Sequence, residues 1–358
     1  MTPVPAGLLE LRAGPGALAH VREHGIAPSD VACIPAAAGG PKGLALVPLD
    51  RLLFREWLDP SADIELVGAS VGAWRMAALA RPDAEAALGR LVLSYVEDQN
   101  YDERPTPDDV ARACRRLALA VHDGRPFEVR PGVTLTLVTS RARGALAGRE
   151  SKLAFGRIAL ANAVSRRRLA RHLERVLFVH GESFLAEPYD AFGSTVVPLG
   201  ASNAEDALVA SGTIPVICSP VRAIAGAPPG NYWDGALVDY HLQLPYPRLQ
   251  RGARRRIVLY PHFNGHVTPG WLDKHLPWRA RPRGHAWLDD VLLIAPSAEF
   301  LASLPNGKLP DRSDFYRYGR DHAGRIRDWN RAIAECARFA EAALGWLRNP
   351  DPSLVRPL

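Results

Sequence analysis

Two strand–turn–helix units follow one another between residues 31 and 80, and they limit the fold more than any other feature of the chain. Residues 31–40 form an apolar run that ends in glycines, which predicts a buried strand and a turn. In 41–58 the apolar side chains recur every three or four positions, which predicts a helix. The pattern repeats in 64–70 and 71–80. This order predicts an α/β fold with a mainly parallel sheet covered by helices.

The rest of the chain extends the same pattern. Further helices are expected near 83–97, 107–121 and 321–348, and further strands at 132–140, 175–181, 255–263 and 291–295. The sequence contains no internal repeat and no low-complexity linker, so we expect one domain over 1–358. Its parts would be a motif-bearing core at about 31–245, an insertion at 141–190, and a C-terminal extension with a long helix at about 265–358.

Composition excludes several classes of protein. The chain has 358 residues, of which 47% are hydrophobic and 23% charged, as in an ordinary globular protein. No apolar run approaches the ~20 residues that span a bilayer, and the first residues lack the pattern of a signal peptide. The four cysteines are scattered without metal-like pairing. We therefore expect a cytoplasmic location and no metal or other cofactor.

Two arginine-rich runs, 165–175 and 251–256, account for much of the net charge of +6. Such runs are typical of a solvated helix face and a loop, but they also suit an anionic surface. No aromatic residues interleave with them and no zinc-finger or RNA-binding motif accompanies them, so we expect no nucleic-acid partner. Peripheral contact with an anionic membrane, on the inner face, remains an expectation to test.

The first glycine-rich turn, AAAGGPKG at 36–43, predicts an anion site. Glycines between a strand and a helix leave the first N–H groups of the helix open to a ligand. Pro41 has no N–H to donate, so Gly39 and Gly40 are the expected donors, and Lys42 adds positive charge. The glycine spacing and the lack of Ser or Thr after Lys42 argue against nucleotide-phosphate loops.

The second turn, GASVG at 68–72, matches the G-x-S-x-G pattern of a nucleophile elbow. An elbow needs small residues such as Gly68 and Gly72 where strand and helix almost touch, and it exposes the serine above the sheet edge. The alternative is an ordinary glycine turn. The predicted strand before Ser70 and the predicted helix after it favour the elbow. The N–H of Val71, at the start of that helix, is a further candidate donor to a negatively charged substrate oxygen.

The third turn, at 231–240, places Asp234 before Gly235 at the end of a hydrophobic segment. An ordinary Asp-Gly turn would explain it, and so would a carboxylate presented at a strand end. The chain order Ser, Asp, His is also available, because Asp234 and Asp239 precede three histidines. An α/β-hydrolase triad would therefore recruit one of His241, His262 and His266.

Together the three turns resemble those of the patatin-like phospholipases, a family of lipid acyl hydrolases with a three-layer α/β/α fold. The segment ASGTIPVICSPV at 210–221 resembles the Ala-Ser-x-x-x-Pro segment that precedes the family's aspartate. The chain departs from the family at Ala38, where a glycine often stands, and at Ala236, which replaces the commoner second glycine after the aspartate. Both replacements are small. The resemblance covers about 31–245 and leaves 246–358 unexplained.

The resemblance implies roles for individual residues. It implies a serine hydrolase that cleaves lipid carboxylic esters through a Ser-Asp dyad, with Ser70 as nucleophile, Asp234 as base, and an oxyanion hole at Gly39, Gly40, Lys42 and Gly43. A serine needs a base to become nucleophilic, and Asp234 would need a raised pKa to serve as one. A non-catalytic relative that binds anionic lipid is the remaining alternative.

Overall fold

The structure is a computed structural model that describes residues 6–101, 105–147, 152–252, 255–280 and 284–358. Its centre is one sheet with the strand order β10-β1-β9-β8-β2-β3-β4-β5-β6, while β7 pairs with β4 beside this path. The strands are β1 (Leu9–Ala13), β2 (Val31–Ala36), β3 (Ile64–Ala69), β4 (Val133–Ala142), β5 (Leu173–His180), β6 (Ser194–Pro198), β7 (Tyr232–Asp234), β8 (Ile257–Pro261), β9 (Val291–Pro296) and β10 (Val355–Pro357).

The middle of the sheet is parallel. β9, β8, β2, β3 and β4 run in one direction, whereas β1 pairs antiparallel with β9, and β5 and β7 pair antiparallel with β4. The predicted α/β class with a mainly parallel sheet is confirmed. The strand predictions in the middle of the sheet are also confirmed, but β1, β6 and β10 at its ends were not predicted, because these short strands carry little apolar periodicity.

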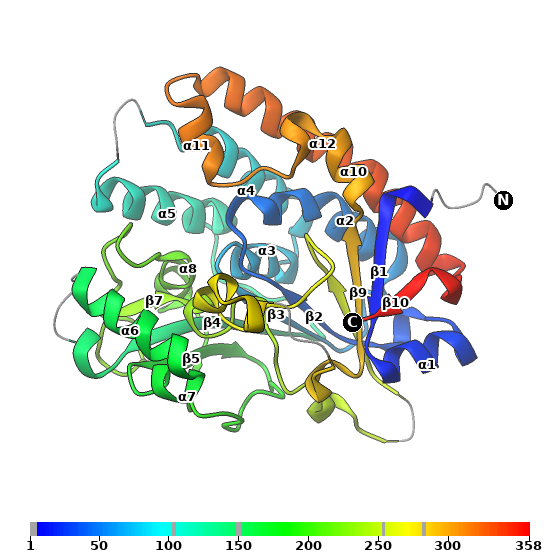
Figure 1. Cartoon of the computed structure of the whole chain (residues 1–358), viewed down its shortest axis with the longest axis horizontal. Coiled ribbons are helices and arrows are strands. Elements are labelled where there is room, and N and C mark those ends of the chain that lie inside the picture. The colour runs from blue at the N-terminus through cyan, green and yellow to red at the C-terminus, as the bar shows by residue number, and fades with distance from the viewer. Residues whose placement is uncertain (1–5, 102–104, 148–151, 253–254, 281–283) are drawn as a thin grey trace.

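Helices lie on both sides of the sheet. In Figure 1, α3, α4, α5, α8 and α12 lie above it and α1 lies below it, an arrangement compatible with three α/β/α layers. The α-helices of the described residues are α1 (Pro15–His24), α2 (Val47–Leu52), α3 (Val71–Ala80), α4 (Ala84–Glu97), α5 (Pro107–His122), α6 (Lys152–Val164), α7 (Arg166–Leu169), α8 (Ala204–Gly212), α9 (Pro277–Ala280), α10 (Ala298–Ser303), α11 (Ser313–Tyr318) and α12 (His322–Arg348).

The first predicted helix, 41–58, is continuous but not regular. It begins as the 3-10 segment η3 (Gly40–Leu46), continues as α2, and ends as the wider turn η4 (Leu53–Trp57). Pro41 follows Gly40 near the start of η3, where the missing N–H has no intrahelical partner to lose. The second predicted helix matches α3 residue for residue.

Two groups of buried side chains hold the fold together. The larger lines the sheet from Leu11 to Val355. The smaller contains residues of α6, α7 and β7, among them Ile158, Leu169 and Trp233. The range of the predicted insertion, 141–190, includes β5, which contains most of the strand predicted at 175–181 and pairs along its whole length with β4. No helix of the described residues is both long and apolar enough to cross a bilayer.

Candidate active site

The sheet brings the three turns of the sequence to one edge. β2 and β3 are parallel neighbours in which Ala36 pairs with Gly68, so the turns that follow them open side by side. On the far side of β3, Ala69 pairs with Val138 of β4. The next residue of β4, Thr139, pairs with Asp234 of β7. Ala69, which precedes Ser70, and Asp234 therefore pair with adjacent residues of β4.

The backbone at Ser70 forms a sharp turn between β3 and α3. Ser70 has φ 58° and ψ −131°, a conformation that a residue with a side chain rarely adopts. A Cβ atom at Gly72 would lie 1.9 Å from the Ala36 carbonyl oxygen, and one at Gly68 would lie 2.5 Å from the Ala73 backbone. Only glycine fits at these two positions, as the elbow pattern predicts.

We expect Gly72→Ala to destabilise the protein by about 1–3 kcal/mol or more, because the added methyl group overlaps a backbone atom that cannot move aside. Thermal denaturation measures the effect. Gly156→Ala is the matched control: a Cβ there meets nothing within 4 Å, and the residue lies within α6. Alanine in a helix is up to about 1 kcal/mol better than glycine. Equal melting temperatures for the two variants would contradict the close contact.

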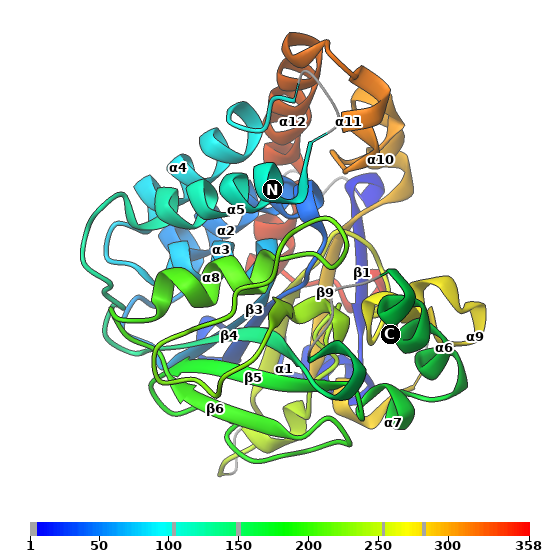
Figure 2. The ribbon, with the colours of Figure 1, turned by 90° about the vertical axis from the view of Figure 1, so that its left-hand side faces the viewer.

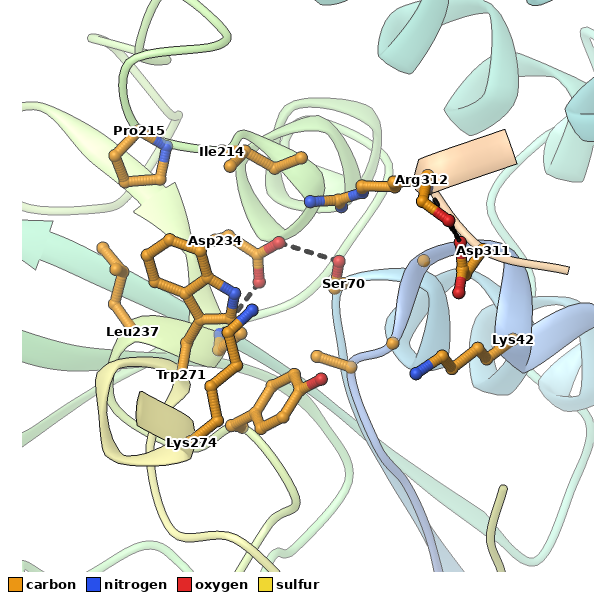
Figure 3. A pocket seen from close by; sticks show the side chains of 16 residues that line it. Lys42, Ser70, Ile214, Pro215, Asp234, Leu237, Trp271, Lys274, Asp311 and Arg312 are labelled. Carbon is orange, nitrogen blue, oxygen red and sulfur yellow. Dashed lines mark hydrogen bonds between the residues drawn. The ribbon is translucent and has the colours of Figure 1, made fainter. Parts of the chain in front are cut away.

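Ser70 and Asp234 are joined by a hydrogen bond. The Ser70 hydroxyl donates to Asp234 Oδ2 over 2.7 Å, as Figure 3 shows. The other carboxylate oxygen, Oδ1, accepts the Ala236 N–H at 2.8 Å. Burial raises the pKa of Asp234 to about 6, while these two hydrogen bonds and the positive charge of Arg312 act in the opposite direction. The carboxyl group is thus a stronger base than an exposed aspartate and still ionises near neutral pH.

Ser211, at the end of α8, links the backbone of the elbow to β4 by two hydrogen bonds. Its hydroxyl accepts the Ser70 N–H at 2.9 Å and donates to the Val138 carbonyl oxygen at 2.8 Å. This contact holds the strained residue to β4. The sequence segment 210–221 contains Ser211, but nothing in its pattern assigns this contact to it.

The glycine loop lies across the pocket from Asp234. Gly39, Gly40 and Lys42 line the cavity, and Gly40 has a φ of 58°, which favours glycine. The N–H of Ala38 is already used, since it donates to the Tyr240 carbonyl oxygen at 3.0 Å. The loop therefore offers its next N–H groups, those of Gly39 and Gly40, to a ligand.

Not every predicted site residue faces the cavity. Gly43 lies behind the loop, where a Cβ atom would come within 2.7 Å of Val71 Cγ1. Val71 is itself buried, and its N–H is at the first position of α3, where no intrahelical partner exists. Gly235 packs closely on Val138, whereas Ala236 lines the cavity. Gly43 and Gly235 thus position other groups.

The cavity holds about 270 Å³ and is rich in positive charge. Lys42, Lys274 and Arg312 line it together with Asp234 and with Asp311, whose carboxylate is paired with Lys308 at 2.8 Å. Arg312 extends toward Ser70 and Asp234 in Figure 3. Lys42 lies over the ring of Phe263 and Lys274 over the ring of Trp271. Burial, with the charges of Arg312 and Lys42, lowers the pKa of Lys274. The sequence interpretation missed the lining residues Trp271, Lys274 and Arg312, which carry no motif.

The three candidate histidines lie in a separate cluster. The rings of His241 and His262 are 4.5 Å apart, and those of His241 and His266 are 6.1 Å apart. Nδ1 of His241 accepts the Thr268 N–H, and Nδ1 of His262 accepts the Asn264 N–H. Among the described residues, the hydrogen-bond partner of the Ser70 hydroxyl is Asp234 and not a histidine.

Within the ranges that the structure describes, no three His, Cys, Asp or Glu side chains are grouped so that they could hold a metal ion. The chain matches no model of a known protein family and no curated protein. Inference about function therefore begins from the geometry at the sheet edge.

Proposed function

We propose that the chain is a serine acyl hydrolase of the patatin-like type, which cleaves carboxylic esters of lipids through Ser70 and Asp234. The observation that carries the proposal is the 2.7 Å hydrogen bond between the two side chains. Ser70 lies on a strained elbow that faces a glycine loop. A serine next to a base and opposite backbone N–H groups is the arrangement that covalent acyl transfer needs. A triad is less well supported, because the Ser70 hydroxyl donates to Asp234 and the rings of His241 and His262 pack against each other.

In the first step, Ser70 Oγ forms a bond with the ester carbonyl carbon while Asp234 Oδ2 accepts the hydroxyl proton. The tetrahedral intermediate then breaks its bond to the alcohol, which leaves with the proton held by Asp234. In the second step, the oxygen of a water molecule forms a bond with the acyl carbon while Asp234 accepts a proton from the water. The bond between Ser70 Oγ and the acyl carbon then breaks, the carboxylic acid leaves, and Asp234 returns the proton to Ser70. The raised pKa of Asp234, about 6, suits a group that must both take and give a proton.

Negative charge develops on the carbonyl oxygen in both steps. The N–H groups of Gly39, Gly40 and Val71 are the candidate donors for this charge. Gly39 is the N-cap residue of η3, and Gly40 and Val71 are the first residues of η3 and α3, so none of the three N–H groups has an intrahelical partner. Loss of one such donor typically lowers kcat by about 10²- to 10³-fold. Lys42 adds a positive charge at the same loop.

The cavity indicates the kind of ester. Its volume of about 270 Å³ lies near the lower end of ligand pockets, so it encloses the ester and its immediate neighbours. Lys42, Lys274 and Arg312 favour a substrate with an anionic group near the ester, such as the phosphate of a phospholipid. Ile214, Leu237 and Trp271 supply apolar contacts for an acyl chain.

A fluorophosphonate probe tests the proposal directly. It should label Ser70 covalently, and mass mapping of the digested protein should locate the modification on the peptide that contains this residue. Labelling at another serine, or no labelling of the folded protein, would contradict the proposal.

The rate of hydrolysis should depend on the ionisation of Asp234. Since only the carboxylate can accept the serine proton, kcat/KM for a soluble aryl ester should fall about tenfold per pH unit below the pKa of about 6 and level off above it. Burial lowers the pKa of His262 to about 3, so a rate governed by this histidine would be flat between pH 5 and 8. A flat profile would therefore exclude Asp234 as the base.

A further inference from the structure

One surface of the protein combines exposed apolar side chains with positive charge. On the outward face of α6, Leu153, Leu160 and Val164 are 69%, 68% and 52% exposed. The adjacent short helix α9 adds Trp278, which is 70% exposed. Large apolar side chains this exposed, and this close together, are uncommon on a protein that meets only water.

The charged residues of 152–171 all have one sign. Lys152, Arg157, Arg167, Arg168 and Arg171 are all exposed, and the sequence from 152 to 171 contains no aspartate or glutamate. We call the outward side chains of 152–171 together with Trp278 the α6 surface. Exposed apolar side chains next to exposed arginines, with no acid in 152–171, suit contact with the interface of an anionic bilayer.

Arg166 differs from its neighbours. Its guanidinium donates to Asp273 Oδ2 at 2.8 Å and to the Val238 carbonyl oxygen at 2.7 Å. It is therefore a structural cation and does not belong to the α6 surface, although the sequence places it in the same basic run. In the second run, 251–256, Arg255 pairs with Asp290 at 2.6 Å, and residues 253–254 lie outside the described residues.

The outward face of α6 is fixed by its inward one. Ala154 and Ile158 pack in the smaller core. Asn162 donates to Asp273 at 2.8 Å, and Arg279 of α9 donates to the carbonyl oxygens of Asn162 and Ala163. Figure 2 shows α6, α7 and α9 together at one side of the molecule. These inward contacts fix the orientation of α6, so Leu153 and Leu160 stay exposed on its outward face.

The α6 surface is next to the candidate active site. Asp273, which binds both α6 and α7, belongs to the segment η8 (Trp271–His275). Two other residues of η8, Trp271 and Lys274, line the cavity beside the dyad. A bilayer that contacts α6 and α9 would therefore lie close to the rim through which an ester must enter.

We propose that the α6 surface docks the protein on an anionic lipid bilayer, with Leu153, Leu160, Val164 and Trp278 in the interface and the arginines on the headgroups. Tryptophan and leucine supply the apolar contact, and the arginines supply the attraction to negative charge. The helix lies on the membrane and does not cross it, in keeping with the absence of a spanning helix among the described residues. This docking does not depend on which residue is the nucleophile.

Vesicle sedimentation of the full chain with Ser70→Ala tests the docking while no lipid is consumed. The protein should bind vesicles of phosphatidylglycerol and phosphatidylcholine at least about tenfold more tightly than pure phosphatidylcholine. Leu153→Ser with Leu160→Ser should lower the affinity at least about tenfold. Arg167→Gln with Arg168→Gln should lower it about fivefold for each arginine, and 0.5 M salt should abolish the preference.

Matched controls separate docking from general changes. Leu93→Ser with Leu119→Ser removes two exposed leucines from α4 and α5, and Arg317→Gln with Arg331→Gln removes two exposed arginines from α11 and α12. Both pairs should bind as the parent does. Equal binding to the two vesicle types, equal losses in the controls, or no binding at all would overturn the proposal.

Two further measurements distinguish the outcomes. Sedimentation velocity would reveal a dimer that the Leu153→Ser and Leu160→Ser changes dissociate, and such a dimer without vesicle binding would assign the α6 surface to a second copy and overturn membrane docking. Hydrolysis of a soluble aryl ester by the chain with Ser70 intact tests the proposed activity separately, and the α6 variants should leave its kcat/KM unchanged within about twofold. Docking and catalysis can therefore fail independently.

Discussion

Ser70→Ala is expected to lower kcat for a soluble aryl ester by about 10⁴-fold or more and to abolish fluorophosphonate labelling. The variant removes the only side-chain oxygen that the elbow presents to the cavity and leaves no nucleophile for the first step. Its backbone is retained, because the hydrogen bond from residue 70 to Ser211 uses the main-chain N–H. Ester hydrolysis and labelling, measured on the same preparation, give the result.

The control for Ser70→Ala is a measurement that the variant still folds. The hydroxyl is buried and donates only to Asp234 among the described residues, so its loss leaves one carboxylate oxygen without a donor and costs about 1–3 kcal/mol at most. The circular-dichroism spectrum should be unchanged. Retention of more than a hundredth of the activity in a folded variant would show that another residue attacks the ester.

Asp234→Asn is expected to lower kcat/KM by about 10²- to 10⁴-fold, since an amide cannot accept the serine proton. Its side chain has the same shape and can still accept the Ala236 N–H through its oxygen. The melting temperature at neutral pH should not fall, because burial raises the pKa of Asp234 and the ionised carboxylate opposes folding there. Stability of the parent protein should correspondingly decline as the pH rises through about 6.

The histidine variants are the counterpart of this experiment. His266→Ala, and His241→Gln and His262→Gln at the two fully buried positions, should each retain most of the activity in the fraction of protein that folds. His241 and His262 pack against each other and against Phe263, so their replacement affects stability first. If any one of the three lowered kcat as much as Asp234→Asn while the melting temperature stayed high, a Ser-Asp-His triad would replace the dyad.

The structure was predicted best from the sequence where a short local pattern is required by a tertiary contact. The elbow at 68–72 is an example, because a Cβ atom at Gly68 would overlap the start of α3 and one at Gly72 would overlap Ala36 of β2. The G-x-S-x-G pattern shows both requirements within five residues. The glycine loop at 36–43 was predicted in the same way, from glycines between the neighbouring predicted strand and helix. Both belong to the α/β class that the order of strands and helices predicted.

The rest of the site comes from contacts between distant segments. Lys274 and Arg312 line the cavity from turns that follow no motif, and they lie more than 200 residues after Ser70 in the chain. The contact of Ser211 with Ser70 spans 141 positions. The outer strands β1 and β10 meet across almost the entire chain. No window of sequence contains such pairs, so periodicity and spacing could not reveal them.

The anchoring of Ser70 and Asp234 at Val138 and Thr139 has a consequence for how such a protein can diversify. The proposed pair depends on β4 and also on the segment just before Ile214, because the Thr213 carbonyl oxygen accepts the Asp234 N–H and Ser211 accepts the Ser70 N–H. Trp271 and Arg312 line the cavity from other connections. Changes around Trp271 and Arg312 should therefore leave the distance between Ser70 and Asp234 unchanged. Under the proposed function, substrate selectivity could then change during evolution, or by grafting these two connections, without changing the pair that carries out the reaction.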